Sequence, residues 1–350
     1  MSYVPAYNRQ GRDMNDLLHG LGFDSVLVQL DGETDVGRNR YGVAGIKPRG
    51  AFHKFIMLWN TIRFCYAAFC HRRRVVVGVG RPSLIVCAFS RMFFAREIVW
   101  YSLEFAMLGP VDKWIYQRLV TAYIDVEENR LRKFSEHYGA KSRALVINNM
   151  PLLHDLPVRG GKLDAYLKAR GVNPTGKRIV IYAGSYQIYA CLDAILSASV
   201  LLPDDMIVVL MAFGLAPEMA AQYGKCVVIP PVQGEGFYDW LADADCSLLP
   251  YESTSDFNVQ NCSPQKIFDC YLAGVPYVAS DRPIIRRLLS LMPNAGMVCD
   301  FTRPDSIAAA VCAVSSRRSQ VREQMELLHK NRLNYGVMSK QLFSFFKELE

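Results

Sequence analysis

The chain has 350 residues, of which 51% are hydrophobic and 21% are charged. This composition offers enough apolar surface for folding, which excludes an extended disordered protein. The length exceeds what one hydrophobic core usually organises and predicts two domains. The net charge of +7 is unevenly divided, because residues 1–150 hold 21 Lys and Arg against 13 Asp and Glu, whereas the remaining residues are close to neutral.

The cysteines and histidines are scattered without a C-x-x-C pair or a cluster of histidines with carboxylates. That usage is typical of small buried thiols in a reducing compartment and disfavours a metal site. No window of about 18 apolar residues is free of charge, and residues 1–12 lack the apolar core of a signal peptide. We therefore expect a cytoplasmic protein that does not span a membrane and needs no metal or other cofactor.

The first half of the chain contains short apolar runs that predict the strands of an α/β domain. They lie at 25–30, 74–80, 84–89, 97–103, 122–126 and 144–148. Such a domain normally opens with a buried strand, yet residues 1–10 contain no apolar run before a helix at about 12–20. Either the first strand is absent or the domain is an abbreviated variant.

The basic surplus concentrates in residues 51–100, where eight Lys and Arg face the single acid Glu97 and where Arg72, Arg73 and Arg74 stand together. Such a patch favours an anionic surface, either nucleic acid or lipid headgroups. The aromatic residues at 52–69 favour an interfacial helix on an anionic membrane surface over nucleic acid. The alternative is a core helix followed by a solvated arginine turn.

The second half alternates strands and helices without a break. We predict strands at 178–184, 206–214, 226–232, 246–251, 275–280 and 295–299, with helices of about ten residues between them. This pattern is typical of βαβ units in a doubly wound parallel sheet. Residues 151–177 are rich in Pro and Gly around one short helix, as an inter-domain connection would be. We place the domains at 1–155 and 156–335, followed by a helix at 336–350.

One segment, residues 261–276, combines a loop, a capped helix and a buried strand. Ser263 is a good N-cap, Pro264 suits the first helical position, and Gly274 suits the residue that ends the helix. The N-terminus of this helix would then point into the crevice beyond the sheet, where a phosphate is stabilised. Lys266 in the first turn opposes the helix dipole unless an anion is bound. Asp269, three residues later, could accept hydrogen bonds from a ribose.

This segment resembles the donor-site helix of GT-B glycosyltransferases, especially the family 4-like enzymes of bacterial polysaccharide assembly. Their pattern P-x-K-x-x-E-x-x-x-x-G-x-P is matched at Pro264, Lys266, Gly274 and Pro276, and Asp269 stands in place of the Glu. The resemblance covers about 150–335, including 182–185, 241–245 and 249–251, and it touches 138–149. It implies two Rossmann-like domains facing a central cleft, with C-terminal helices that pack back toward the first domain.

The resemblance further implies a metal-independent hexosyltransferase that uses a nucleotide sugar as its substrate. Backbone groups at Gly184 and Ser185 would close over the diphosphate, and Pro231 and Val232 would hold the base. The chain also departs from the pattern. Asn261 stands at a donor-site position where the family has an acid, and no Arg/Lys pair follows Ser185. The sequence therefore leaves the retaining or inverting outcome open.

Glu104 follows the apolar run at 97–103 and would face the same cleft, where a carboxylate could act as general base toward an acceptor hydroxyl. Glu127, Glu128 and Arg130 follow the run at 122–126 and suit the start of a helix better than catalysis. The leading hypothesis is sugar transfer from a UDP- or GDP-type donor to a growing, lipid-linked glycan at the inner membrane face. The alternatives are a nucleotide-sugar epimerase and a catalytically silent GT-B subunit in an envelope assembly.

Overall fold

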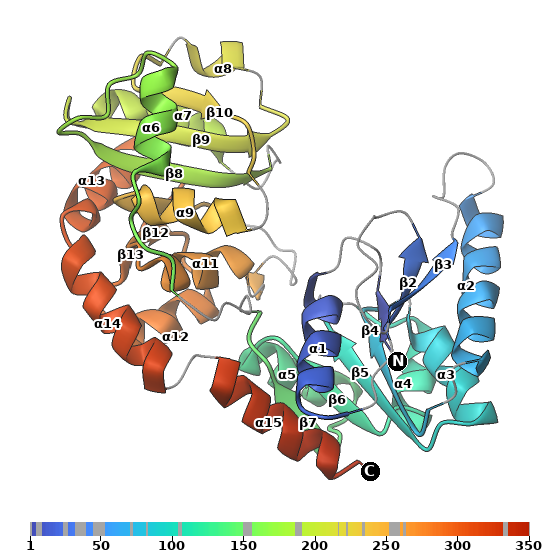
Figure 1. Cartoon of the computed structure of the whole chain (residues 1–350). Coiled ribbons are helices and arrows are strands. Elements are labelled where there is room, and N and C mark those ends of the chain that lie inside the picture. The colour runs from blue at the N-terminus through green and yellow to red at the C-terminus, as the bar shows by residue number, and fades with distance from the viewer. Residues whose placement is uncertain are drawn as a thin grey trace. The chain divides into compact units, whose positions relative to one another are not determined.

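The computed structural model consists of two compact units, which are described here one at a time. The first comprises Met1–Asn149 with Tyr335–Glu350, and the second comprises Met150–Asn334 (Figure 1). The structure describes residues 2–4, 9–23, 27–31, 40–44, 53–70, 73–81, 83–103, 107–149, 156–185, 191–215, 217–221, 223–232, 235–251, 260–261, 264–331 and 335–349. Among these residues no helix is both long and apolar enough to cross a membrane.

The first unit is built on a parallel sheet with the strand order β3-β2-β1-β4-β5-β6-β7. Its strands are β1 (Ser2–Val4), β2 (Leu27–Asp31), β3 (Arg40–Ala44), β4 (Val75–Val79), β5 (Glu97–Ser102), β6 (Ala122–Asp125) and β7 (Arg143–Val146). Strands β4 to β6 are almost entirely buried. Parallel strands are covered by helices on both faces, which is why their sequences form continuous apolar runs.

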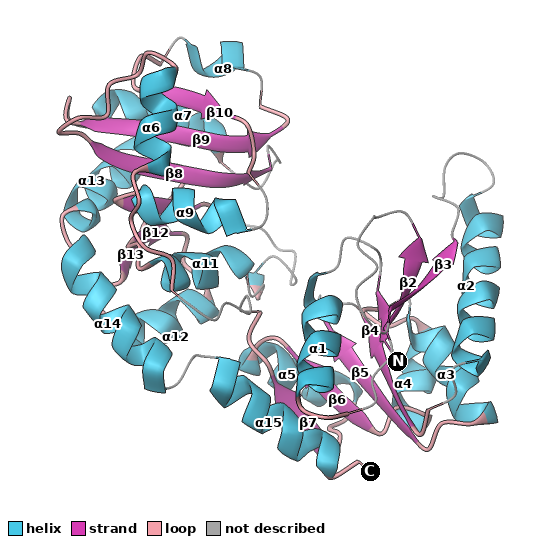
Figure 2. Ribbon diagram, viewed as in Figure 1, coloured by secondary structure: helices cyan, strands magenta, loops and turns pink. Residues whose placement is uncertain are grey.

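The helices of the first unit are α1 (Arg9–Gly20), α2 (His53–Cys70), α3 (Ser83–Phe93), α4 (Pro110–Arg118), α5 (Glu128–Tyr138) and α15 (Tyr335–Lys347). Each of the first five connects one strand to a later one, as Figure 2 shows. The expectation of a missing or abbreviated first strand is wrong. Strand β1 lies inside the sheet, where it pairs with β2 and β4, and its three residues are too few to stand out as an apolar run.

The strand predicted at 84–89 is also wrong, because these residues belong to helix α3. A short apolar run does not distinguish a strand from a buried helix. The buried side chains follow helical spacing, at Ser83, Leu84, Val86, Cys87 and Ser90. The helix lies directly on β4, since a Cβ added at Gly78 would stand 2.3 Å from the Cys87 Sγ.

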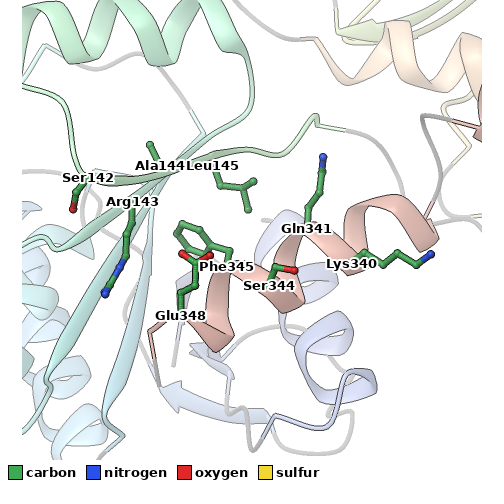
Figure 3. A pocket seen from close by; sticks show the side chains of 9 residues that line it. All are labelled: Ser142, Arg143, Ala144, Leu145, Lys340, Gln341, Ser344, Phe345 and Glu348. Carbon is green, nitrogen blue, oxygen red and sulfur yellow. The ribbon is translucent and has the colours of Figure 1, made fainter.

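Helix α15 belongs to the first unit although it is last in the sequence. Its Phe343 and Phe346 rings lie 5.8 and 6.1 Å from the ring of Phe23, just after α1. Between α15 and the edge strand β7 lies a groove of about 450 Å³ (Figure 3). Phe345 points toward the strand, whereas Lys340 points away from it. None of the predicted site residues lines this groove, and α15 serves as a cover for an otherwise open sheet edge.

The second unit contains a parallel sheet with the order β10-β9-β8-β11-β12-β13. Its strands are β8 (Arg178–Ser185), β9 (Met206–Phe213), β10 (Cys226–Ile229), β11 (Cys246–Leu249), β12 (Tyr277–Ala279) and β13 (Gly296–Val298). Its helices are α6 (Lys162–Ala169), α7 (Leu192–Leu201), α8 (Pro217–Ala221), α9 (Glu235–Asp243), α11 (Gln265–Ala273), α12 (Pro283–Leu291), α13 (Pro304–Ser315) and α14 (Arg318–Asn331). Both sheets therefore have the strand order of a doubly wound domain.

The acidic segment before β11 has a structural role. The buried Asp243 accepts hydrogen bonds from the backbone N–H groups of Gly160, Gly161 and Leu163, at 2.9, 2.9 and 2.8 Å. Asp245 accepts one from the N–H of Ile179 at 2.8 Å. These bonds tie the start of α6 and the start of β8 to the end of α9, and the predicted 241–245 motif serves this scaffold.

Candidate functional site

The order of the second sheet reverses between β8 and β11, since the connections run outward on either side of this pair. In doubly wound folds ligands bind outside the carboxyl ends of the strands at such a reversal. Strand β8 ends there in Gly184 and Ser185, and β11 is followed by Pro250 and Tyr251. Two of the predicted donor-site residues therefore stand at the point where the topology opens a crevice.

Helix α11 starts one residue later than predicted. Its N-cap is Pro264, with extended backbone dihedrals, and its first helical residue is Gln265. Ser263, predicted as the cap, lies outside the described residues. The N–H groups that open an α-helix have no acceptor within it, and here they are those of Gln265 and Lys266.

The end of α11 agrees with the prediction. Gly274 adopts a left-handed conformation with φ 62° and donates to the carbonyl of Tyr271. The side chain of Arg322 on α14 covers it, because a Cβ added at Gly274 would stand 2.3 Å from the Arg322 Cδ. Arg322 also donates to the carbonyls of Pro157 and Ala273, which adds a cation to the negative end of the helix dipole.

Lys266 reaches from α11 to the end of β8. Its Nζ lies 4.7 Å from the centroid of the Tyr182 ring. It also lies so close to Gly184 that a Cβ added there would stand 2.2 Å from the Nζ. The two residues are far apart in sequence, and the fold brings them together at the reversal of the sheet. The absence of a side chain at Gly184 makes room for the ammonium group.

The ammonium of Lys266 is half-buried, and burial lowers its pKa from 10.5 to about 8. Nearby Cys270 and Asp269 act in the opposite direction. Among the described residues no carboxylate forms an ion pair with Lys266, and its Nζ lies over the face of the Tyr182 ring instead. A cation–π contact stabilises the charge less than a carboxylate would. A bound anion would restore the pKa of this lysine.

Asp269 is buried rather than open to solvent, with 5% of its surface exposed. Its Oδ1 accepts a hydrogen bond of 2.8 Å from the hydroxyl of Tyr238 on α9. Tyr238 is itself buried, so α9 orients this carboxylate. The interaction of Asp269 with a ribose stays a prediction.

For the other predicted site residues the structure shows burial but little that bears on their binding roles. Pro231 and Val232 are half-buried just after β10, and Val232 donates its N–H to the Met211 sulfur at 3.5 Å. Asn261 is buried, with 4% exposed. The side chain of Ser185, and Glu104 and Arg72 as a whole, lie outside the described parts of the chain. The binding roles of all these residues stay predictions.

Comparison with solved structures gives many matches over the whole chain. HepE from Anabaena in complex with UDP has a TM-score of 0.73 at 10% identity and covers 99% of each chain. A glycosyltransferase from Rickettsia africae has a TM-score of 0.74 at 12% identity, over 99% of this chain and 97% of that one. The chain has the GT-B glycosyltransferase fold. WaaG, a glycosyltransferase involved in lipopolysaccharide biosynthesis, aligns at a TM-score of 0.66 and 12% identity, over 97% of this chain and 98% of its own.

No protein-family model and no curated protein matches the sequence. The assignment of the GT-B fold therefore depends on architecture. It confirms the predicted class, two Rossmann-like parallel-sheet domains with a C-terminal helix that returns to the first unit. Among the described residues no group of three His, Cys, Asp or Glu side chains could hold a metal ion.

Two residues of the candidate site were missed from the sequence. Tyr182 supports Lys266, and Tyr238 donates to Asp269. Both contacts join elements that are distant in sequence. The only available signal was the position of Tyr182, two residues before the Gly184–Ser185 turn, on the same side of strand β8 as Gly184.

The first GT-B unit holds a buried ionic cluster after β6. The Arg130 Nε lies 3.2 Å from the Asp125 Oδ1, and both side chains are almost fully buried. Asp125 also accepts a 2.6 Å hydrogen bond from the Tyr123 hydroxyl, and the N–H groups of Val126 and Glu127 donate to its Oδ1. Burial raises the pKa of Asp125, while Arg130 lowers it. The negative carboxylate is thus held by a cation and several donors.

This cluster extends toward the predicted general base. An Nη of Arg130 donates to the carbonyl of Leu103 at 3.0 Å, and Leu103 directly precedes Glu104. Glu127 caps helix α5, since its side chain accepts a hydrogen bond from the N–H of Arg130. Glu127 and Arg130 are therefore structural residues at the start of α5, and the cluster anchors the segment that leads to Glu104.

Proposed function

We propose that the protein is a glycosyltransferase that uses a nucleotide sugar of the UDP or GDP type. The observation that carries this proposal is the ammonium of Lys266, which lies against Gly184 under the first turn of α11 and has no carboxylate partner among the described residues. A diphosphate supplies the charge that this position favours. The GT-B fold supports the same conclusion, and solved relatives of this fold include HepE with UDP.

The proposed chemistry is stabilisation of the leaving nucleoside diphosphate. As the bond between the sugar and the phosphate breaks, negative charge develops on the phosphate oxygen. The N–H groups at the start of α11 and the Lys266 ammonium stabilise that charge, so the proposal requires no metal. Glu104 is proposed as the general base that accepts the proton of the acceptor hydroxyl, and Asp269 as the residue that contacts the ribose.

The acceptor in this proposal is a hydroxyl of a growing glycan that is attached to a lipid. The reaction would take place in the cytoplasm, at the inner face of the plasma membrane, in polysaccharide biosynthesis. The basic surplus of the first unit supports this location, because anionic lipids attract Lys and Arg.

A thermal-shift panel of nucleotide sugars tests the donor. A ligand at 100 times its dissociation constant adds about 2.7 kcal/mol to the unfolding free energy. We expect a UDP- or GDP-sugar to raise the melting temperature, with no effect from the matching free sugar. The same shift in a Lys266→Ala variant, or no shift with any donor, would contradict the proposal. Lys168→Ala, an exposed lysine in the same unit, is the control.

A catalytically silent GT-B subunit is the second candidate, and Asn261 favours it. The family pattern has an acid at this position, and the neutral Asn261 is buried. Release of free nucleoside diphosphate from the donor in the presence of a membrane extract distinguishes the two. Binding of the donor without release would support the silent subunit.

A further inference from the structure

Helix α2 is predominantly apolar, yet few of its described side chains are buried. Its described side chains include just two that are fully buried, Phe64 and Ala68, which pack against Val86 of α3. Several large apolar side chains of the same helix are exposed: Leu58 (59%), Trp59 (46%), Ile62 (51%), Tyr66 (70%) and Phe69 (43%). A helix of this composition normally lies inside a protein or in contact with lipid.

Helix α3 presents a second apolar face beside it. Its Ile85, Met92 and Phe93 are 51%, 66% and 62% exposed. Together the two helices form an open groove of about 770 Å³. On each helix the lining residues recur every three or four positions, which places them on one face: Leu58, Ile62 and Phe69 on α2, and Ile85, Phe89 and Met92 on α3. A continuous apolar groove of this kind marks an interaction site.

One end of the groove is basic. Both helices end near the start of a strand, where the N–H of Arg96 donates to the carbonyl of Arg74 at 2.8 Å. Arg91 donates to the carbonyl of Ala95 at 3.3 Å and also to that of Arg96. All three arginines are exposed. Glu97 is the sole acid in residues 51–100, and it pairs with Arg143 at 3.6 Å. The positive charge of this corner is therefore not neutralised along the two helices.

We infer that the α2–α3 groove docks on an anionic lipid bilayer. The apolar side chains enter the acyl region, and Arg74, Arg91 and Arg96 contact the headgroups. An apolar face beside clustered basic residues has the two attractions that hold a protein in an interface. Trp59 and Tyr66 suit the boundary between acyl chains and water. A second copy of the chain would be bound less favourably than lipid, because the same clustered arginines would face each other.

This inference specifies how the protein would bind the membrane at which the proposed reaction takes place. Its biological role rests on the proposed function. It differs from the sequence prediction in the residues that form the membrane-binding surface. Residues of α2 form only half of the groove, and residues of α3 form the other half. Arg91 and Arg96, near the end of α3, also lie outside the 51–74 segment. Of the three predicted membrane arginines, Arg73 is half-buried, Arg74 is exposed and Arg72 lies outside the described residues.

Flotation with vesicles of phosphatidylcholine, with or without 30% phosphatidylglycerol, tests the inference without measuring sugar transfer. Failure here would thus leave the donor site untouched. We expect the wild type to bind the anionic vesicles at low salt and to be released by high salt. The Ile62→Ser/Met92→Ser variant should bind at least tenfold more weakly, because two exposed apolar side chains no longer enter the lipid. Its control is Leu201→Ser/Leu327→Ser, two similarly exposed residues of the second unit.

The basic corner is tested by Arg74→Gln/Arg96→Gln. Each basic residue near such a surface contributes about 1 kcal/mol, so we expect roughly thirtyfold weaker binding to anionic vesicles. Lys168→Gln/Lys177→Gln, in the second unit, is the control and should bind like the wild type. Equal binding to both kinds of vesicle overturns the inference, as does wild-type binding by both test variants. A dimer in sedimentation experiments that Ile62→Ser/Met92→Ser abolishes, without vesicle binding, also overturns it.

Discussion

Two cations lie near the carboxyl ends of the two sheets, and their surroundings are opposite. In the first unit Arg130 is buried against Asp125 and donates to a backbone carbonyl. In the second unit Lys266 is half-buried over an aromatic ring and has no carboxylate partner among the described residues. A cation that is satisfied within the protein stabilises the fold. A cation that is desolvated and has no ion pair among the described residues favours an anionic ligand. This contrast distinguishes Arg130, which stabilises the fold, from Lys266, which we propose as a ligand-binding residue.

The largest effect is expected from removal of the paired cation. Arg130→Met should lower the unfolding free energy by about 3–5 kcal/mol, because it leaves the buried Asp125 without its counter-charge. The loss should be smaller at pH 5 than at pH 8. Burial already raises the pKa of Asp125, and without Arg130 the folded state binds a proton more readily than the unfolded state, so stability falls as pH rises. Urea unfolding at both pH values measures this.

Arg132→Met is the matched control, since Arg132 lies on the same helix but is exposed. It should change the unfolding free energy by less than about 0.5 kcal/mol. Equal losses from the two variants would show that the Asp125–Arg130 pair contributes no more to the unfolding free energy than the exposed Arg132 does.

Removal of the unpaired cation should act on binding instead of on the fold. Lys266→Ala should weaken the affinity for UDP or GDP by about 1.5–3 kcal/mol, since a charged hydrogen bond to the diphosphate is lost. The ligand-free protein should be as stable as the wild type or more so, because a desolvated charge is removed. Calorimetric titration and urea unfolding measure the two quantities. An unchanged affinity would count against the site.

The same lysine predicts a pH dependence. Below its pKa of about 8 Lys266 is charged and would bind the proposed diphosphate, whereas above it the ligand-free protein carries a neutral amine. The affinity for UDP should therefore fall roughly tenfold between pH 7.5 and 9.5 as the lysine loses its proton. The Lys266→Ala variant should show no such fall over this range. A flat profile for the wild type would mean that Lys266 does not contact the phosphates.

The smallest effect is expected at Tyr238→Phe, which removes the hydrogen bond to Asp269. A neutral donor to a carboxylate contributes on the order of 1 kcal/mol. We expect a stability loss of that size. The ratio of the affinities for UDP and its 2′-deoxy analogue should also be severalfold smaller, because Asp269 would be less firmly oriented. An unchanged ratio would show that Asp269 does not take part in recognition of the ribose.

Much of the second unit could be predicted because its signals are local. The Pro264 and Gly274 ends of α11 follow from backbone preferences of single residues, and the helix was wrong by one residue at its start only. The errors lie in elements whose secondary structure depends on contacts with residues that are distant in sequence. The three residues of β1 form a strand because β2 and β4 flank them, and α3 is a helix because its one face lies on β4.

The candidate site also combines features that follow from local sequence with features that depend on packing. The position of Lys266 in the first turn of α11 follows from sequence, but its contact with Tyr182 and Gly184 depends on the packing of α11 against β8. The exposure of α2 could not be predicted either, since the same apolar composition fits a core helix. What decides is whether other elements cover it, and in the described part of the first unit several of its large apolar side chains stay exposed.

The position of α15 has a consequence for how the protein forms during synthesis. The first unit needs this helix beside α1 and along the edge strand β7, yet α15 follows the whole second unit in the sequence. At about 5–20 residues per second, a ribosome makes the 185 residues of the second unit, Met150–Asn334, in roughly 10–40 seconds. During that time the emerging first unit has an unprotected strand edge. It is then open to pairing with other nascent chains or to capture by a chaperone.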